Sequence, residues 1–458
     1  MLRVMYCAVL SFFVLLGCSS AATLAAPVEL KTESVPEPIF NSKVFIQQSG
    51  REHKDTLVFV HGLGDNGARD WDAIIAALAN RFHIVTFDLP GFGRSERKNA
   101  DYSPESYSRF LHWVVTNYTG GHVTLVGHSM GGAISLYYAA QHPEVVQRLI
   151  LFDAAGVLHR GALLRFMTSV PEDGPGNTKL MQRSAAQVNE WVSIAIVKGE
   201  ALSQQFGGLI DESAVRNFLV KDTPTTIAGA ALVATDFSAI IPKTTSPVFL
   251  IWGERDRVAP LRTGLVLERQ LASVQLVTIA DAAHVPMRES PQRALALVEE
   301  FLRADDPPWR ATPPPTSIPR NAPELHCENK HGVTFTGVFS RVTIDKCEDV
   351  RLSNVTTTEL VVKHSKLDLV NVRVTGNGTA ARISNSILIG TNIEWRADIG
   401  LDVTDSRMDL AGANLSGSRH SIISHGASVI VCSLCQLGGR ETSRPWHGVF
   451  ELSDAVYD

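Results

Sequence analysis

A serine flanked by glycines stands where a strand-like stretch of the sequence gives way to a helix-like one. The segment Gly127–Gly131 reads GHSMG and matches the pattern G-x-S-x-G, with Ser129 at its centre. The apolar run HVTLVG precedes the serine, and the apolar run AISLYYAA follows it. A sharp strand-to-helix turn exposes such a side chain, and only glycine fits two residues to either side. Ser129 is therefore a candidate nucleophile, although an ordinary glycine turn gives the same pattern.

A serine nucleophile needs a base, and the base needs an acid that orients it. Asp256 follows the apolar run VFLIWG, and His284 follows the run VQLVTI. Both positions are predicted strand ends, in the chain order Ser, Asp, His. Asp153, which follows RLILF, is a rival for the acid. We favour Asp256 because it belongs to the segment GERD, which a proline soon follows.

Acyl chemistry at a serine also needs two backbone N–H groups that stabilise a developing oxyanion. The residue after the nucleophile, Met130, is the first candidate. The second is Leu63, which lies in the glycine-rich segment HGLGDNG that follows the run LVFV. Glycines in that segment would let its backbone approach a substrate.

The elements that must position these residues alternate between two types. Nearly continuous apolar runs of strand length alternate with segments that carry apolar residues at helical spacing, as in ARDWDAIIAALANR. This alternation predicts an α/β fold with a doubly wound, mostly parallel sheet over residues 40–305. Residues 157–240 interrupt the rhythm and are expected to form a helical cap. The proline-rich segment 306–323 predicts an extended linker.

The segment 324–458 has a different texture, with short β-rich pieces separated by polar turn residues. The pieces VTIDKC, LVVKHS, ARISNS, LDVTDS and SIISHG start at residues 342, 360, 381, 401 and 421, so they recur every 18 to 21 residues. This period indicates the coils of a parallel β-helix-like domain. A small sandwich with accidental spacing is the alternative.

Cysteine placement agrees with an oxidising compartment. No cysteine lies between residues 19 and 326, and four follow: Cys327, Cys347, Cys432 and Cys435. An even number suggests two disulfides, and the spacing of 20 residues would stack Cys327 directly on Cys347. A zinc site formed by the four is less favoured because no histidine stands at ligand spacing.

The N-terminus has the features of an export signal. Arg3 precedes an apolar run, Val4–Leu16, which is too short to span a membrane comfortably. The run ends in LLGC, which resembles the lipobox of bacterial lipoproteins. By that resemblance residues 1–17 are a signal peptide, Cys18 is lipidated, residues 18–39 form a tether, and the protein is sorted to the outer membrane. A plain signal peptide cleaved near Ala22 or Ala26 is the alternative.

Taken in order, several segments together resemble the α/β-hydrolase fold family. The segments are HGLGD, FDLPGFGRS, GHSMGG, WGERD and AAH, at the order and spacing of that family. The resemblance implies ester hydrolysis through an acyl-enzyme. In it Ser129 would attack, His284 relay the proton and Asp256 orient His284, while the Leu63 and Met130 amides would bind the oxyanion. It implies neither a metal nor a cofactor. Ser129 occupies the position where dehalogenases and epoxide hydrolases of the family carry Asp.

These features favour an envelope-anchored carboxylesterase or lipase that acts on a small-molecule or lipid ester. C–C bond hydrolases, peptidases and haloperoxidases share the fold, and an inert binding lipoprotein is a further alternative. We expect the C-terminal domain to be non-catalytic, to bind a polysaccharide or a protein or act as a spacer, and to be dispensable for turnover of small esters. A net charge of -5 without a basic patch argues against nucleic acid as a partner.

Overall fold

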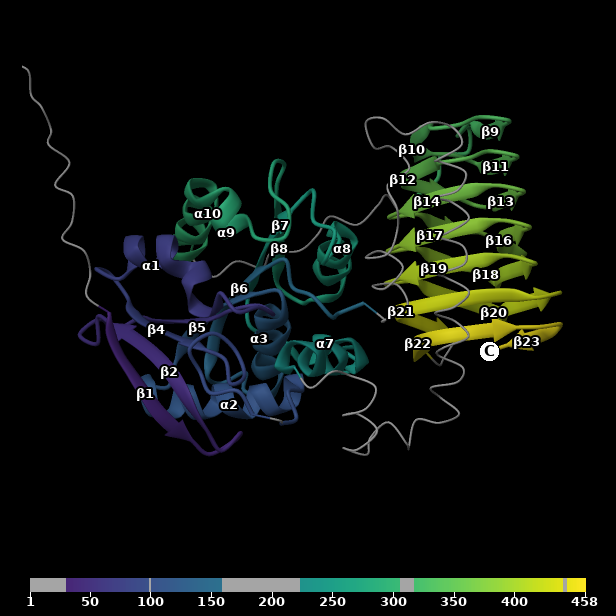
Figure 1. The fold of residues 1–458 in the computed structure, drawn as a ribbon. Coiled ribbons are helices and arrows are strands. Elements are labelled where there is room, and N and C mark those ends of the chain that lie inside the picture. Colours follow the sequence, from purple (N-terminus) through teal and green to yellow (C-terminus); the bar gives the residue numbers. More distant parts are fainter. Residues whose placement is uncertain (1–29, 99, 159–222, 305–316, 440–442) are drawn as a thin grey trace, which may run out of the picture.

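The computed structural model describes residues 30–98, 100–158, 223–304, 317–439 and 443–458. These residues form an N-terminal α/β domain and a C-terminal stack of strands that stand side by side (Figure 1). The strands of the α/β domain are β1 (Lys31–Glu37), β2 (Ser42–Ser49), β3 (Thr56–Val60), β4 (His83–Asp88), β5 (Val123–His128), β6 (Val146–Phe152), β7 (Val248–Gly253) and β8 (Val274–Ile279). Its helices are η1 (Gly67–Trp71), α1 (Asp72–Leu78), α2 (Pro104–Tyr118), α3 (Met130–Gln141), α7 (Pro224–Ala234), η2 (Ile241–Lys243), α8 (Leu261–Gln270), α9 (Pro286–Glu289) and α10 (Pro291–Arg303).

The α/β domain is built on one eight-stranded sheet with the order β1-β2-β4-β3-β5-β6-β7-β8. The hairpin of β1 and β2 is antiparallel and joins β4 in antiparallel fashion, whereas all neighbours from β4 to β8 are parallel. Every residue of β3, β4, β5 and β7 is buried. This burial explains their continuous apolar sequences, since helices cover both faces of a parallel sheet. The predicted doubly wound α/β fold is confirmed.

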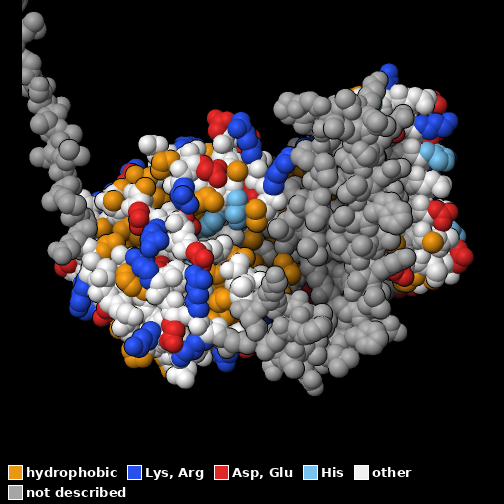
Figure 2. All heavy atoms as spheres, in the orientation of Figure 1, with side chains coloured by type: hydrophobic (Ala, Val, Ile, Leu, Met, Phe, Trp, Pro, Cys, Tyr) orange, Lys and Arg blue, Asp and Glu red, His pale blue; other side chains and the backbone are white. Residues whose placement is uncertain are grey.

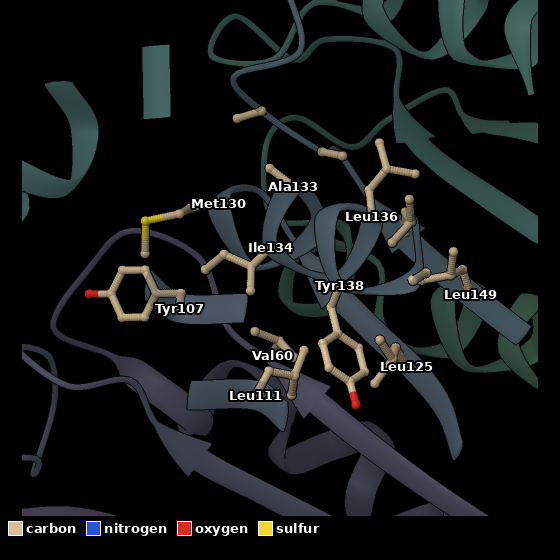
Figure 3. Packing of buried hydrophobic residues seen from close by; sticks show 14 of the residues in the cluster. Val60, Tyr107, Leu111, Leu125, Met130, Ala133, Ile134, Leu136, Tyr138 and Leu149 are labelled. Carbon is tan, nitrogen blue, oxygen red and sulfur yellow. The ribbon is translucent and has the colours of Figure 1, made fainter. Parts of the chain in front are cut away.

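Helix α3 lies against the centre of this sheet and begins directly after the strand-to-helix turn that contains Ser129. Figure 3 shows Ile134 and Tyr138 of α3 packed among Val60 of β3, Leu111 of α2 and Leu125 of β5. All five side chains are buried. Burial of each large apolar side chain contributes about 1.5–3 kcal/mol to stability, so the start of α3 is held firmly on the sheet.

The C-terminal strands wind into a closed, helix-like stack. They are β9 (Glu324–Glu328), β10 (Thr334–Val338), β11 (Arg341–Asp345), β12 (Val350–Thr357), β13 (Leu360–Lys363), β14 (Lys366–Val370), β15 (Arg373–Thr375), β16 (Thr379–Ser384), β17 (Ile387–Thr391), β18 (Glu394–Thr404), β19 (Arg407–Ala411), β20 (Asn414–His425), β21 (Ser428–Gly438), β22 (Ser443–Leu452) and β23 (Ala455–Tyr457). Strands one coil apart pair in parallel, so that Val342 faces Leu360, which faces Ala381, which faces Leu401. The predicted β-helix-like architecture is therefore confirmed, and the sandwich alternative is wrong.

One corner of each coil repeats the same turn and the same hydrogen bond. Lys346, His364, Asn385 and Asp405 all have φ between 45° and 51°, a left-handed conformation that suits polar turn residues. The residue after each corner joins a ladder in which a backbone N–H donates to the serine hydroxyl one coil later: Cys347 to Ser365, Ser365 to Ser386, Ser386 to Ser406 and Ser406 to Ser428. At the corner these buried N–H groups have no partner in the sheet, and the serine hydroxyls provide the hydrogen-bond acceptors that they need.

All four described cysteines are buried, each with a free thiol. Cys327 and Cys347 nevertheless stack as predicted, with their Sγ atoms 2.8 Å apart. Burial and the neighbouring thiol raise the pKa of Cys327 to about 12. Cys432 and Cys435 flank a bulge in β21, where the pairing with β22 shifts register. The two disulfides remain predictions.

Helix α8 belongs to the α/β domain and is also bound to the C-terminal stack. Arg262 in its first turn donates to Asp409 Oδ2 at 3.0 Å and to the Gly390 carbonyl at 3.1 Å. At the other end of the helix, Gln270 donates to the Leu434 carbonyl at 2.8 Å. The Arg262 side chain is 10% exposed and that of Asp409 is 4% exposed. Both ends of α8 are therefore fixed to the coils that carry β17, β19 and β21 (Figure 1).

Apolar contacts make this junction a shared core. Ala411 of β19 and Leu434 of the β21 bulge belong to the buried cluster that contains Val266 and Leu267 of α8. Leu434 has φ of 54°, and its side chain is 2% exposed. A chain without the C-terminal domain would expose this core to water. These contacts lead us to expect that the α/β domain needs the C-terminal domain for its stability, whereas the sequence suggested a dispensable module.

Several sequence predictions fall outside the described residues. They are the signal peptide and its lipidated Cys18, most of the tether, the larger part of the cap and most of the proline-rich linker. Of the expected cap, the described part includes helix α7. Among the described residues, no helix combines the length and the apolar character needed to cross a membrane.

Candidate active site

Ser129 occupies the turn between β5 and α3 in a strained backbone conformation. Its φ is 52° and its ψ is −120°, outside the regions that L-residues prefer. A Cβ added to Gly127 would stand 2.6 Å from the Gly131 carbonyl oxygen, and one added to Gly131 would stand 2.2 Å from the Val60 carbonyl oxygen. The two glycines of the motif are therefore required by close backbone approach, and they hold Ser129 at the carboxyl edge of the sheet.

The structure brings together Ser129, His284 and Asp256 in one hydrogen-bonded line. His284 Nε2 lies 3.0 Å from Ser129 Oγ, and His284 Nδ1 lies 2.8 Å from Asp256 Oδ2. An ionised carboxylate only accepts hydrogen bonds, so Nδ1 carries the proton and Nε2 is free to accept one from the serine hydroxyl. The His284 side chain is 20% exposed, whereas the Asp256 carboxylate is fully buried.

The loop after β7 holds the Asp256 carboxylate rigidly. Its Oδ1 accepts from the backbone N–H of Val258 at 2.7 Å and of Ala259 at 3.0 Å, which leaves Oδ2 for the histidine. Trp252 at the end of β7 is fully buried, and its indole N–H donates to the Ala259 carbonyl at 2.7 Å. The loop thus has its own internal bonds and leads directly into α8.

Asp153, the rival acid, has a different partner. It follows β6 with φ of 43°, and its Oδ1 accepts from the Gly253 backbone N–H at 2.9 Å. Its carboxyl is fully buried beside that of Asp256. Burial, followed by the charge of Asp256, raises the pKa of Asp153 well above its ordinary value. The structure therefore places Asp256, and not Asp153, on the histidine.

The two predicted oxyanion donors belong to segments that adjoin the serine. Met130 is the first residue of α3, and first-turn amides of a helix have no acceptor within that helix. Gly62, which precedes Leu63, packs closely against the turn, because a Cβ added to it would lie 2.9 Å from Ser129 Cβ. The neighbouring His61 is buried and links this loop to another, since Leu89 N–H donates to its Nε2 at 2.8 Å. The Leu63 side chain itself is 38% exposed.

Sequence reasoning missed a role for His128, the residue before the serine. Its Nε2 lies 2.7 Å from the His284 carbonyl oxygen, so it donates a proton there. The two imidazole rings are 4.9 Å apart. Burial lowers the pKa of His128 to about 3, which keeps the ring neutral. The signal for this role was the histidine in GHSMG, but nothing in the sequence identifies its partner.

The segment FDLPGFGRS is explained by a buried charge cluster. Asp88 at the end of β4 accepts from Arg94 Nε at 2.7 Å and from Ala68 N–H at 2.8 Å. Burial alone would raise the pKa of Asp88, but the hydrogen bonds from Arg94 and Ala68 lower it below its usual range. Gly67 and Gly93 leave room for this carboxylate, because a Cβ on either would stand within 2.5 Å of it. The cluster supports the loops beside the site.

Nothing in the described part of the chain resembles a metal centre, since no group of three or more His, Cys, Asp or Glu side chains there could hold an ion. Figure 2 shows histidine side chains that reach the surface of the α/β domain among hydrophobic neighbours.

A family model for the alpha/beta hydrolase fold matches residues 55–291, just over half of the 458-residue chain. The chain belongs to the α/β-hydrolase fold family. An uncharacterised protein of Mycobacterium tuberculosis is 29% identical to it over 265 residues, which cover 55% of this chain and 76% of that protein. Lipase 1 of Psychrobacter immobilis is 26% identical over 252 residues, which cover 54% of this chain and 77% of that lipase.

Among solved structures, an esterase of Exiguobacterium antarcticum is similar to this α/β-hydrolase at 20% identity and a TM-score of 0.44. The match covers 60% of this chain and all of that one. The family resemblance drawn from HGLGD, FDLPGFGRS, GHSMGG, WGERD and AAH is thus confirmed, and hydrolase activity follows from the family and its lipase relatives.

Proposed function

We propose that this hydrolase cleaves carboxylic esters through an acyl-enzyme formed on Ser129. The observation that carries the proposal is the hydrogen-bonded line from Asp256 through His284 to Ser129, with distances of 2.8 and 3.0 Å. Lipases among the relatives support an ester as the substrate. A small-molecule or lipid ester is therefore the class of substrate that we propose.

Each group has a distinct role in the proposed reaction. Ser129 Oγ attacks the ester carbonyl while His284 Nε2 takes its proton, and the same nitrogen then protonates the leaving alkoxide. Asp256 holds the ring and stabilises the imidazolium. The Met130 and Leu63 amides are the proposed oxyanion donors. Met130 lies at the positive N-terminal end of α3, and Leu63 lies in the glycine-rich loop after β3. Water then attacks the acyl-enzyme with His284 as its base, which frees Ser129.

The site of action proposed here is the cell envelope. The support for it is the LLGC sequence that ends in Cys18, preceded by a short apolar run. Lipidation of Cys18 would tether the enzyme to a membrane and place it close to lipid esters. The proposal rests on sequence alone.

The decisive experiment uses the soluble chain that begins after Cys18, assayed on p-nitrophenyl esters with short to long acyl chains. Ser129→Ala should lower kcat by at least about 10³-fold with little change in binding, because the triad acts as a unit. Ser418→Ala, which alters a hydroxyl in the C-terminal domain, is the matched control. The chain-length optimum separates an esterase from a lipase. Equal turnover by wild type and Ser129→Ala, or none by either, would refute the proposal.

A further inference from the structure

A second buried carboxyl lies behind the acid of the proposed triad. Asp153 is fully buried at the carboxyl end of β6, next to the strand that leads to Asp256. Its backbone N–H donates to the Ile251 carbonyl at 3.1 Å, and its Oδ1 accepts from Gly253 N–H at 2.9 Å. The first bond fixes the backbone of Asp153 and the second fixes its carboxyl, which is buried away from water.

The surroundings of this carboxyl disfavour a negative charge. The ionisable groups that act on it are themselves acidic: Asp256 in the loop after β7 and Glu289 in α9. Both acidic neighbours disfavour a charge on Asp153, and its Oδ2 is buried without a hydrogen-bond donor. An unpaired buried carboxylate is strongly unfavourable, and such groups take up a proton instead.

The neighbouring carboxylate of Asp256 can accept that proton. Asp153 and Asp256 meet at one turn, because Gly253 N–H donates to Asp153 Oδ1 at 2.9 Å and the Gly253 carbonyl accepts from Asp256 N–H at 3.2 Å. The charge of Asp256 acts on Asp153 there. Two ionised carboxylates cannot hydrogen-bond to each other, because both are acceptors only. A protonated carboxylic acid, in contrast, can donate a hydrogen bond to a carboxylate. Asp256 Oδ2 has one donor, His284 Nδ1, and so has a lone pair to spare. A proton shared between the two carboxyls would satisfy the unpaired oxygen of Asp153 and use the spare lone pair of Asp256.

We propose that Asp153 is held as a neutral acid and donates its proton in a hydrogen bond to Asp256, as a positioning residue behind the triad. The inference rests on the function proposed above and deepens it. A neutral Asp153 leaves a single negative charge next to His284. Its hydrogen bond also fixes the Asp256 carboxylate and lowers its affinity for the proton of the imidazolium. The acid limb of the pH profile is thus set partly by a residue that touches neither substrate nor histidine.

Two substitutions separate this role from a merely structural one. Asp153→Asn keeps a donor of the same shape and suits the left-handed backbone at this position, whereas Asp153→Ala removes the donor. We expect Asp153→Asn to keep kcat/KM within about threefold of wild type and to leave the acid limb in place. We expect Asp153→Ala to lower kcat about tenfold at unchanged KM, the loss of one charge-assisted hydrogen bond. The acid limb of kcat/KM should also move to higher pH, because Asp256 then holds the imidazolium more tightly.

Infrared spectroscopy tests the proton directly and without turnover. The full chain should show the C=O band of a protonated carboxyl at neutral pH, sensitive to exchange into D₂O, and Asp153→Asn should lack it. Absence of this band in wild type, or an Asp153→Asn variant as impaired as Asp153→Ala, would overturn the proposal. Failure of wild type to hydrolyse any ester would refute the proposed function alone, since the band is measured independently. If Asp153→Ala does not fold, the band and Asp153→Asn still decide the matter.

Discussion

Two of the three histidines at the candidate site are neutral because they are buried. Burial lowers the pKa of both His61 and His128, and the pKa of His128 falls to about 3. Each uses a ring nitrogen to fix the backbone of a neighbouring loop, His61 at Leu89 and His128 at His284. Buried neutral imidazoles thus act as rigid supports, while the partly exposed His284 is the ring that can exchange protons with a substrate.

This burial has a consequence for stability at low pH. The pKa of His128 is lowered on folding from 6.5 to about 3, so between these values the folded chain binds fewer protons than the unfolded chain. The free energy of unfolding therefore falls as the pH falls through this window. His128→Phe should make this decline shallower, by up to about 1.4 kcal/mol per pH unit.

Urea unfolding at a series of pH values checks this expectation. His326→Phe is the control, because the His326 side chain is 64% exposed. The comparison uses the slope against pH and not the absolute stability, since His128→Phe also removes the hydrogen bond to His284. A slope identical to that of wild type would show that folding does not lower the pKa of His128.

The main residues of the site were predictable because their motifs bear local constraints. Ser129, Asp256 and His284 each follow an apolar strand, and the order of parallel strands brings their ends to one edge. The partners of His128 and Asp153 were not predictable. Their contacts join β5 to the loop after β8, and the residue after β6 to the last residue of β7, and such pairs have no periodicity in the sequence.

At the scale of elements, the start of α3 is fixed by backbone contacts as well as by its apolar face. Gly131 in its first turn lies so close to β3 that a Cβ would stand 2.2 Å from the Val60 carbonyl oxygen and 2.4 Å from that of His61. The helix, the strand and the loop that carries Leu63 therefore move together. Any side chain at this position must shift Ser129 relative to Leu63.

Gly131→Ala tests this coupling. We expect a loss of about 1–3 kcal/mol in the free energy of unfolding, typical of overpacking, because the atoms in the way are backbone. kcat for esters should fall at least about tenfold, since small displacements of a reacting group are costly. The measurements are urea unfolding and ester kinetics.

The matched control is Gly120→Ala, where no other atom lies within 4 Å of the added Cβ. This variant should keep both properties of wild type. Full activity in a folded Gly131→Ala protein would mean that the turn adjusts without disturbing the serine.

At the scale of the whole molecule, the C-terminal domain shares its core with the hydrolase domain. Arg262 and Asp409 form a nearly buried ion pair across the junction, and Leu434 lies in the cluster that contains Val266. Arg262 stands only six positions beyond Asp256. The coils therefore support the helix that follows the acid loop of the proposed triad.

Deletion of residues 317–458 should consequently destabilise the hydrolase domain. Val266 and its neighbours would be exposed, and apolar area removed from water contributes about 25 cal/mol per Å². We expect a lower melting temperature, binding of a hydrophobic dye and loss of most ester turnover. Unchanged melting and turnover would instead support the dispensable module that the linker sequence suggested.

Arg262→Ala in the full chain isolates the ion pair from the rest of the junction. It leaves Asp409 buried without its partner, a change that typically costs about 3–5 kcal/mol. A double replacement of both residues by apolar side chains should recover part of that loss. Comparison of this variant with the truncated chain shows whether the truncation destabilises the hydrolase domain through the lost contacts of α8 or through exposure of the shared core.

The junction was beyond the reach of sequence reasoning, although the architecture on each side was not. The period of 18 to 21 residues was enough to predict the coils, because each coil repeats the same corner and inward-facing apolar positions. The bulge at Leu434 interrupts the pairing of β21 locally, and no periodicity of the sequence marks it. The proline-rich segment suggested two independent bodies, and only the packing of α8 reveals that they are joined.

Because the serine ladder repeats from coil to coil, the stack could gain a coil without a change in its hydrogen-bonding pattern. Each coil offers the next the same corner, the same hydroxyl and the same parallel edge, so one more unit of about 20 residues would fit between two existing coils. It would lengthen the stack by about 4.8 Å, the spacing of paired strands. Coils added before β13 would leave the α8 junction untouched. Related chains with different numbers of coils would therefore hold the β9 end of the stack at different distances from the same catalytic domain, in steps of one coil.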